Sequence, residues 1–426
     1  MNTSLGHHTF TIHRRIVSSN AKKLLDDFHK YRDRTNEIKV YIPNRELKKV
    51  HTLKRLRAHG IRVPTGSNEM KIDYISDSHK GLNWILKFYK SSQVTECIIE
   101  AKINPKVFAG IRDYIIASND SYLRVVEELF NEEASRISPL LGKFSLYTPK
   151  RIDFCINFDL MELGIPCTPE QMMWLIKRGD YPSYFQEWQY YDKKSHRWRN
   201  SNHSFYLKSG TVNINCYYKY LQLKEQFSDC PNIEDALHII RFEVQCLYRK
   251  TYMMMNRMKK QLKKDNITDP IAIIHRMLSD MTAERELDKY FKRMIKSGDY
   301  YTLAEATRMI EDEGFPLRKE EDIIYFLNEI NKVGLARIRE RIHPSEINRF
   351  YKVLDELAKL NINPITIPKS FKVKHIPNLL DSFNRLKESG GLIDTSYIDP
   401  YEPLGEPFEP SANHEDVENL LDDNPL

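Results

Sequence analysis

Residues 204–219 have the sequence SFYLKSGTVNINCYYK. An apolar and aromatic run is followed by the turn signal Ser209-Gly210 and then by strict alternation, which predicts a β-hairpin. Because successive side chains of a strand point to opposite faces, the second half divides into two sets. The apolar set is Val212, Ile214, Cys216 and Tyr218, and the polar set is Asn213, Asn215, Tyr217 and Lys219. We therefore expect Tyr217 to lie beside a lysine on a solvated face.

Two other segments alternate in the same way. Residues 151–158, RIDFCINF, place Asp153 on the polar side, and residues 239–248, IIRFEVQCLY, place Arg241 and Glu243 there. Three strands with one apolar face each predict an antiparallel sheet that helices cover on one face. If the three strands are neighbours, the opposite face gathers six polar side chains, which are Asp153, Asn215, Tyr217, Lys219, Arg241 and Glu243.

The surrounding segments complete an α+β pattern. Runs at 9–16, 71–76, 84–89 and 96–103 predict further strands, and helices are expected at 19–34, 109–116 and 121–136. After residue 250 the apolar period becomes helical, and Thr302 and Glu305 form a capping box. We expect a sheet-based domain at 1–250, an all-helical domain at 251–392 and a disordered acidic tail at 393–426. The helical domain could contain a DNA-reading helix-turn-helix or be a plain helical bundle.

The charge of the chain is unevenly distributed. The formal net charge is +6, yet nine of the 59 acidic residues lie at 399–426, where no lysine or arginine occurs. Taking nine from 59 leaves 50 acidic residues against 65 basic ones in the rest of the chain. Such a surplus attracts polyanions and favours nucleic-acid binding over a merely solvated basic surface. A basic segment at 48–62 fits a DNA-facing arm and an exposed loop equally well.

Apolar runs and cysteines indicate the compartment. No window approaches the roughly 18 uninterrupted apolar residues of a membrane span, and the N-terminus lacks the apolar core of a signal peptide. The six cysteines are scattered without a CxxC pair, which is typical of reduced structural residues rather than of disulfides or zinc ligands. We expect a cytoplasmic protein without a membrane segment.

The predicted polar face holds the groups that metal-assisted phosphodiester transfer requires. That chemistry needs a nucleophile, carboxylates or imidazoles for a hard divalent ion, and cations that neutralise the phosphate. The candidates are Tyr217 as nucleophile, Asp153 and Glu243 as carboxylates, and Lys219 and Arg241 as cations. The same residues could instead be ordinary solvated positions of a one-sided sheet.

Three further side chains are weaker candidates for a metal ligand. His13 shares the predicted polar face of the first strand, and His203 precedes the hairpin. An isolated histidine is more often a surface or capping residue than a ligand. Glu100 is weaker still.

The three strand motifs, in their order, resemble the core of rolling-circle replication initiators of Gram-positive plasmids. They are also similar to phage gene II-type replication endonucleases and conjugative relaxases. The matching segments are R-I-D at 151–153, Y-L-K-S at 206–209, Y-Y-K at 217–219 and R-F-E-V at 241–244. With the segments GDYYTLAEA and NINPITIPKSF further on, the resemblance spans about residues 145–385.

The resemblance implies a Rep nuclease-like fold and a metal-dependent DNA endonuclease and strand transferase, in other words a tyrosine nickase. The hydroxyl of Tyr217 would attack an origin phosphodiester and leave a 5′-phosphotyrosine and a 3′-OH primer for rolling-circle replication of a plasmid or phage. Mg²⁺ or Mn²⁺ would be held by Asp153 and Glu243. Lys219 would stabilise the charge of the transferred phosphate.

The implied partner is origin DNA, single-stranded or in a hairpin, contacted by Lys208, Arg241 and Asn215. A host helicase and polymerase are the further partners that the resemblance implies. Two features depart from the family pattern. The His-hydrophobic-His metal motif is missing, because His7, His8 and His13 have the wrong spacing, and Lys208 replaces the usual glycine of the hairpin.

Other functions stay open at this point. A conjugative relaxase would use the same chemistry and is not distinguished by the chain. A non-catalytic origin DNA-binding protein would keep the fold and the basic body, and it predicts salt-sensitive DNA binding without a covalent adduct. An RNA-binding module is disfavoured, because the sequence has no RRM- or KH-type signature.

Overall fold

The computed structural model describes residues 3–16, 18–35, 38–41, 69–76, 81–90, 95–111, 113–192, 197–199, 203–226, 232–264 and 269–388. The predicted basic arm at 48–62 and the predicted acidic tail at 393–426 lie outside these residues.

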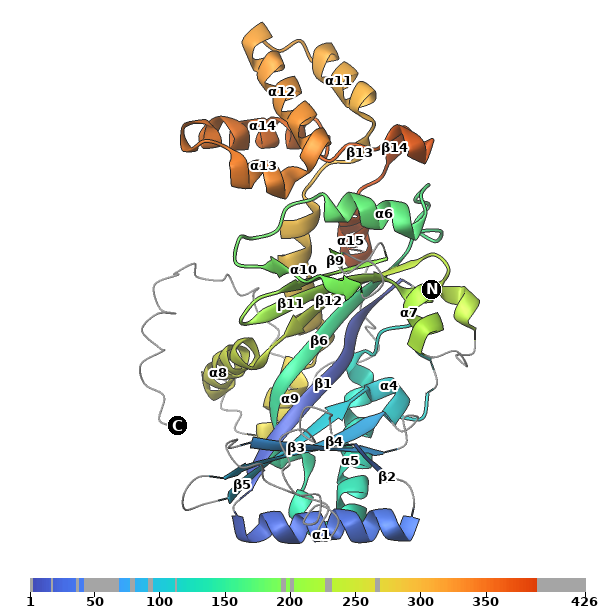
Figure 1. Cartoon of the computed structure of the whole chain (residues 1–426), viewed down its shortest axis with the longest axis vertical. Helices are drawn as coiled ribbons and strands as arrows, with labels where there is room; N and C mark the ends of the chain where they lie inside the picture. Colours follow the sequence, from blue (N-terminus) through green and yellow to red (C-terminus); the bar gives the residue numbers. More distant parts are fainter. Residues whose placement is uncertain are drawn as a thin grey trace.

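A ten-stranded antiparallel sheet runs through the centre of the described structure (Figure 1). In spatial order its strands are β2 (Ile38–Tyr41), β3 (Glu69–Ser76), β4 (Leu82–Lys90), β5 (Thr95–Ile103), β1 (Ser4–Ile16), β6 (Thr148–Asp159), β12 (Ile239–Cys246), β11 (Val212–Tyr218), β10 (Ser204–Lys208) and β7 (Gln186–Glu187). Every neighbouring pair is antiparallel. The predicted class, α+β with an antiparallel sheet followed by a helical region, is confirmed.

The three strands singled out in the sequence are neighbours in this sheet. β12 lies between β6 and β11, so that Glu243 is opposite Asn215 on one side and Cys155 on the other. Tyr217 is opposite Arg241. Because residues opposite each other in an antiparallel ladder point to the same face, the polar side chains of the three strands share one face. The face assignment from alternation is therefore confirmed.

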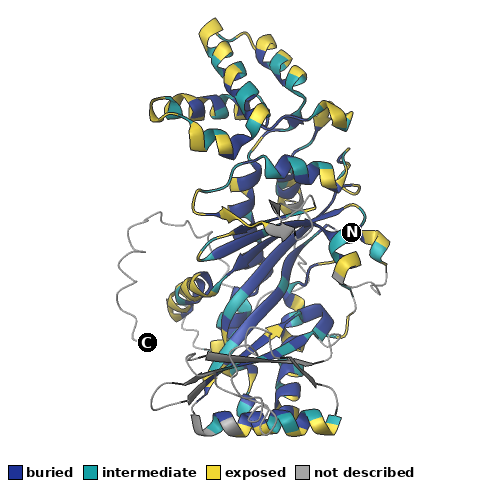
Figure 2. Ribbon diagram, viewed as in Figure 1, coloured by how far each residue is buried: buried dark blue, intermediate teal, exposed yellow. Residues whose placement is uncertain are grey.

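Helices bury the apolar face of the sheet. Those that pack on it or on one another beside it are α1 (Ser18–Thr35), α5 (Leu123–Ile137), α6 (Pro169–Lys177), α8 (Tyr248–Lys264), α9 (Pro270–Met277) and α10 (Asp280–Ile295). Phe291 of α10 stacks on Phe158 of β6 with ring centroids 5.1 Å apart, and it meets Phe242 of β12 edge-on. Near the other end of the sheet, Trp84 of β4 packs against Phe130 of α5. Figure 2 shows the central strands of the sheet as buried, whereas the helices around them are exposed on their outer sides.

A helical region follows at the upper end of the molecule in Figure 1. It consists of α11 (Leu303–Asp312), α12 (Leu317–Val333), α13 (Leu335–Arg341) and α14 (Ile347–Lys359), with α15 (Leu379–Glu388) returning to α10. Two short strands, β13 (Tyr300–Tyr301) and β14 (His375–Ile376), pair at its base, and β8 (Tyr190–Asp192) pairs with β9 (Arg197–Arg199) elsewhere. The predicted domain boundary at residue 250 falls inside α8, and both α8 and α10 pack on the sheet. The division into separate domains stays a prediction.

Two local expectations are wrong. Lys219 does not continue the strand, because β11 ends at Tyr218 and Lys219 is the first residue of helix α7 (Lys219–Gln226), whose Leu223 is buried. The helix expected at 109–116 is not present in its described residues, 109–111 and 113–116, and the short helix α4 (Pro105–Phe108) ends just before them. The chain turns at Gly110, which has φ +86°, a conformation open to glycine without a steric cost.

The polar face of the three strands is covered rather than solvated. A small second core, formed by Ile115, Leu223, Ala236 and Ile239, lies on it beside α7. The segment 113–118 runs beside β1, where His7 and Ser118 exchange two backbone hydrogen bonds. The expectation of a solvated face is therefore wrong, since segments outside the sheet exclude water from much of it.

Two compositional expectations can be checked on the described residues. Five cysteines in this part of the chain are free thiols, and four of them are buried. None of the described helices combines the length and the apolar character that crossing a bilayer would need.

Candidate functional site

A tyrosine and a carboxylate meet on the covered polar face. Tyr217 of β11 donates a hydrogen bond from its hydroxyl to Oε1 of Glu243 in β12, with 2.6 Å between the oxygens. Both side chains are buried, with exposed fractions of 7% and 3%. Burial raises the pKa of Tyr217 well above its ordinary value, and the negative charge of Glu243 raises it further. At neutral pH the side chain is thus a neutral phenol, whose proton already points at a carboxylate placed to accept it.

Lys219 brings a positive charge close to this pair. It is almost fully buried at the start of α7, and its Nζ donates to Oε1 of Gln222 at 2.7 Å. The same Nζ lies 5.9 Å from the centre of the Tyr217 ring. The adjacency of tyrosine and lysine expected from the sequence is therefore present, although a helix rather than a strand supplies the lysine.

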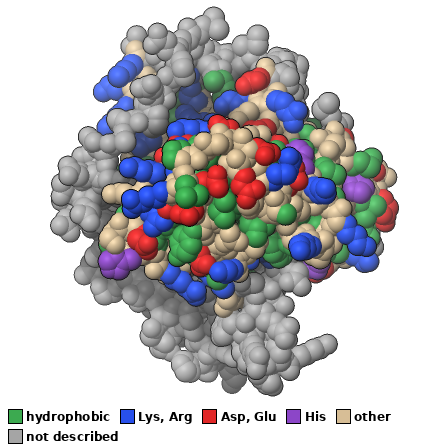
Figure 3. All heavy atoms as spheres, turned by 90° about the horizontal axis from the view of Figure 1, so that it is seen from above, with side chains coloured by type: hydrophobic (Ala, Val, Ile, Leu, Met, Phe, Trp, Pro, Cys, Tyr) green, Lys and Arg blue, Asp and Glu red, His purple; other side chains and the backbone are tan. Residues whose placement is uncertain are grey.

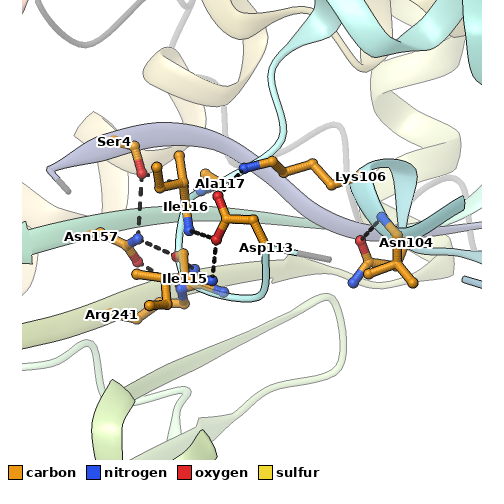
Figure 4. A network of polar contacts seen from close by, with 10 residues as sticks. Ser4, Asn104, Lys106, Asp113, Ile115, Ile116, Ala117, Asn157 and Arg241 are labelled. Atoms are coloured by element: carbon orange, nitrogen blue, oxygen red, sulfur yellow. Dashed lines mark hydrogen bonds and ion pairs between the residues drawn. The ribbon is translucent and has the colours of Figure 1, made fainter. Parts of the chain in front are cut away.

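Arg241 holds a covering segment onto the sheet (Figure 4). Its Nε donates to Oδ1 of Asn157 at 2.7 Å, its second amino group donates to the carbonyl of Ile115, and Asn157 donates to that same carbonyl at 2.6 Å. The guanidinium is fully buried. It is therefore not accessible to a DNA strand in this structure, in contrast to the direct DNA contact expected from the sequence.

Asp153 of β6 is engaged on both of its oxygens. Oδ2 accepts a hydrogen bond from the hydroxyl of Thr9 at 2.8 Å, and Oδ1 accepts one from Nε of Arg151 at 2.7 Å. Although burial opposes the charge of Arg151, the neighbouring carboxylate raises its pKa above the ordinary value. Asp153 is thus half of a largely buried ion pair at the wall of the site.

A cleft of about 390 Å³ opens on this face. The predicted residues that line it are Asp153, Asn215, Tyr217 and Glu243. Arg151 and Lys102 add positive charge to its wall. Tyr218 and Glu225 line the cleft as well, so that it presents two phenols, three carboxylates and two cations, and the cations and phenol hydroxyls are donors suited to a phosphate group.

His8 also lines the cleft, and the alternation of the first strand did not predict it. A β-bulge between His7 and Thr9 adds one residue at His8 and turns its side chain out of the regular alternation. Its Nδ1 lies 3.3 Å from NH1 of Arg241, and because a guanidinium only donates, Nδ1 accepts and the other ring nitrogen carries the proton. Burial, then the charges of Arg241 and Lys219, lower the pKa of His8 well below its ordinary value.

Of the two histidines singled out in the sequence, only one is at the cleft. His203 lines it, next to β10. His13 contacts the ring of Tyr248 instead, with 5.7 Å between the ring centroids. Glu100 is also away from the cleft, where it forms ion pairs with Lys87 and Lys150.

Lys208 lies on the neighbouring strand β10 and is exposed. Its Nζ is 4.8 Å from the ring centre of Trp188 and 5.3 Å from that of Tyr206. The Tyr206 hydroxyl donates to Gln245, which lines the cleft. A lysine and two aromatic rings thus continue from the cleft to the outer surface of the sheet.

No group of three or more His, Cys, Asp or Glu side chains in the described residues is arranged to hold a metal ion. Asp153 and Glu243 nevertheless line the same cleft and offer hard oxygen donors. Mg²⁺ is commonly bound by one or two carboxylates, with phosphate oxygens of the substrate and water as further ligands. The residues present fit such a site.

The sequence and the structure were also compared with those of known proteins. No protein-family model matches the sequence, and none of the curated proteins matches it. Among solved structures, the rolling-circle replication initiator protein from Geobacillus stearothermophilus aligns over 59% of this chain and 77% of its own, with 10% identity and a TM-score of 0.21. This score is too low for the likeness to bear on fold or function, so the function has to be argued from the site.

Proposed function

We propose that this chain nicks one DNA strand at an origin through Tyr217 and so initiates rolling-circle replication of a plasmid or phage. The observation that carries the proposal is the hydrogen bond between the Tyr217 hydroxyl and Glu243, inside a cleft with basic side chains on its wall. A nucleophile within reach of its base, next to a place for the reacting group, is the arrangement that such catalysis needs. The strand motifs described above point in the same direction.

The chemical step would proceed as follows. The Tyr217 oxygen attacks the phosphorus of an origin phosphodiester, while its proton passes to Glu243. The bond from phosphorus to the 3′ oxygen breaks, and this oxygen takes up a proton from water. The products are a 5′-phosphotyrosine and a 3′-OH end that a polymerase can extend. Lys219 and Arg151 would stabilise the negative charge that develops on the phosphate.

A divalent ion is part of the proposal. Asp153 and Glu243 would hold Mg²⁺ or Mn²⁺ at the cleft, where the ion would polarise the phosphate. Asn215 in the wall of the cleft and Lys208 beside it would contact the DNA. Arg241 acts indirectly in this scheme, because it holds the covering segment 113–118 onto the polar face of the sheet. A helicase and a polymerase of the host would act on the nicked origin.

The alternative is a non-catalytic origin-binding protein. The near-complete burial of Tyr217 favours it, because the hydroxyl has to reach a phosphate. A conjugative relaxase would carry out the same step on a transfer origin, and no feature of the site distinguishes it from a replication initiator.

The test is a nicking assay on supercoiled DNA that carries the gene and its flanking sequence, with Mn²⁺, comparing Tyr217→Phe with Tyr218→Phe. Tyr218 is a matched control, since it is the next residue, is also buried and donates its hydroxyl to the carbonyl of Leu237. We expect the native chain and Tyr218→Phe to form nicked circles with protein at the 5′ end, and Tyr217→Phe to form none. Adduct formation by Tyr217→Phe, or DNA binding without nicking by all three, would exclude Tyr217 as the nucleophile.

A further inference from the structure

Helix α8 carries an unusual concentration of charge outside the cleft. Its 17 residues, YRKTYMMMNRMKKQLKK, include seven basic side chains and no acidic one. Lys250 is buried and pairs with Glu286 at 2.8 Å. The other six are exposed, and they are Arg249, Arg257, Lys259, Lys260, Lys263 and Lys264. Within the described part of the chain no carboxylate neutralises any of these six.

Other exposed helices of the same molecule neutralise their cations. In α11, Arg308 pairs with Glu305 and Asp312, and comparable pairs occur along α12 and α14. Figure 3, which looks onto the upper end of the molecule, shows basic and acidic side chains interspersed. In α8, by contrast, the exposed lysines face like charges one turn apart, an arrangement that disfavours a helix in isolation. Carboxylate pairs of this kind are missing from the exposed side of α8 in the described structure, which gathers six exposed cations on one helix.

The opposite side of α8 argues against a lipid bilayer as its partner. Met254, Met255 and Met258 are buried in the main core, and Leu262 is buried as well. The six basic side chains are exposed, together with Tyr248, Tyr252 and Met253 in the first half of the helix, and Figure 2 shows one side of α8 exposed. A helix that binds a bilayer inserts its apolar side into the bilayer. In α8 the methionine side is already packed against the rest of the protein. A polyanion, which needs only surface charge, is therefore a more suitable partner for α8 than a membrane.

The position of α8 relates it to the cleft. β12, which carries Glu243 and the cleft residue Gln245, ends at Cys246, and α8 begins two residues later. The exposed rings of Tyr248 and Tyr252 lie together at that end, with centroids 6.2 Å apart. From there the helix extends for roughly 25 Å at 1.5 Å per residue. This length corresponds to about seven base pairs of duplex.

We propose that the exposed side of α8 binds the phosphate backbone of double-stranded DNA, independently of its sequence. The helix would hold the duplex that flanks the site engaged by the cleft. Each lysine that contacts a phosphate releases a counterion, so the affinity falls steeply with salt. This inference concerns binding rather than cleavage, and it does not require Tyr217 to be the nucleophile.

The experiment measures binding of a labelled duplex of unrelated sequence by fluorescence anisotropy, over about 50–200 mM NaCl. The full chain is compared with a fourfold variant, K259Q/K260Q/K263Q/K264Q. Glutamine keeps the helix propensity close to that of lysine, and all four sites are exposed, so the fold is retained. The matched control, R308Q/K332Q/R349Q/K359Q, removes the same number of charges from cations that have carboxylate partners.

We expect the slope of log affinity against log salt to become shallower by roughly three to four in the α8 variant. Near about 100 mM salt its affinity for the duplex should be reduced by at least about tenfold. The control should retain the native slope. An unchanged slope in the α8 variant, or an equal loss in the control, would overturn the proposal. So would tighter binding of the native chain to phosphatidylserine vesicles than to the duplex at the same salt. The duplex of unrelated sequence contains no origin and the readout is binding, so a failure of nicking leaves this result unchanged.

Discussion

At the scale of single residues, the site depends on which group takes the proton of Tyr217. Glu243 is the acceptor of the hydroxyl in the structure, whereas Asp153 is occupied by Thr9 and Arg151. The two carboxylates expected to act together as metal ligands therefore have different surroundings. In the proposed scheme Glu243 acts on the nucleophile as well as on the ion, whereas Asp153 acts on the ion alone.

Replacing Glu243 by glutamine separates these roles. Glutamine still accepts the hydrogen bond from Tyr217 but is a far weaker base, so we expect adduct formation to fall by about 10²–10⁴-fold. DNA affinity should change little, because the side chain is buried. Single-turnover nicking measured beside the anisotropy titration tests this. Equal rates for Glu243→Gln and the native chain would show that another group takes the proton.

His7 gives a second prediction at this scale. It is fully buried beside Phe10, neither ring nitrogen has a hydrogen-bond partner within the described structure, and burial lowers its pKa to about 3. The unfolded chain protonates this group near pH 6.5. Between these two values the unfolded chain binds more protons than the folded one, so the free energy of unfolding falls as the pH decreases, by up to about 1.4 kcal/mol per pH unit.

We therefore expect His7→Leu to flatten the acid side of the stability profile and to raise the melting temperature near about pH 5. Thermal melts across the pH range measure this, with exposed His238→Gln as the control. If the melting temperatures of His7→Leu and the native chain changed in parallel with pH, the pH dependence could not be assigned to His7.

At the scale of elements, the segment 113–118 decides how the polar face is covered. Asp113 accepts hydrogen bonds from the backbone N–H groups of Ile115 and Ile116, and it pairs with Lys106 at 2.6 Å (Figure 4). Burial opposes the charge of Asp113, yet the bonds from Lys106 and Ile115 lower its pKa below the ordinary value. The carboxylate thus sets the shape of the segment that Arg241 then attaches to the sheet.

Asp113→Ala should destabilise the fold by about 1–3 kcal/mol, because it leaves two N–H groups and an ammonium without their acceptor. Urea unfolding measures the change, and Lys106→Met is the control that removes the ion pair alone. A loss no larger for Asp113→Ala than for Lys106→Met would show that the two backbone bonds contribute little.

At the scale of the whole molecule, one hydrophobic core joins the sheet to the helices that follow. Phe291 of α10 contacts Phe158 and Phe242 in the sheet. It also contacts Phe383 of α15, with 5.7 Å between the ring centroids of Phe291 and Phe383. Buried residues of the same core continue into α12 and α14. The sheet and the helical region are therefore expected to unfold together.

Phe291→Ala should cost about 3–5 kcal/mol, because it opens a cavity at this junction. Calorimetry should show a single transition that moves to lower temperature as a unit. Tyr351→Ala, at an exposed position of α14, is the control and should change the transition little. Two separated transitions in either protein would indicate that the helical region is an independent folding unit.

Alternation alone determined three strands, their apolar and polar faces, and the placement of Tyr217, Asn215, Glu243 and Asp153 on one side of a sheet. These features are local, because the two-residue period of a strand fixes the side of each residue wherever the strand lies.

Only the tertiary structure decided what covers that side and what each polar group does there. The cover comes from distant parts of the chain, since Arg241 bonds a carbonyl 126 positions away. His8 enters the cleft through a bulge, and Lys219 comes close to Tyr217 through a helix start, and both features interrupt the period that made the rest predictable. Burial and partners are long-range properties, and no local pattern encodes them.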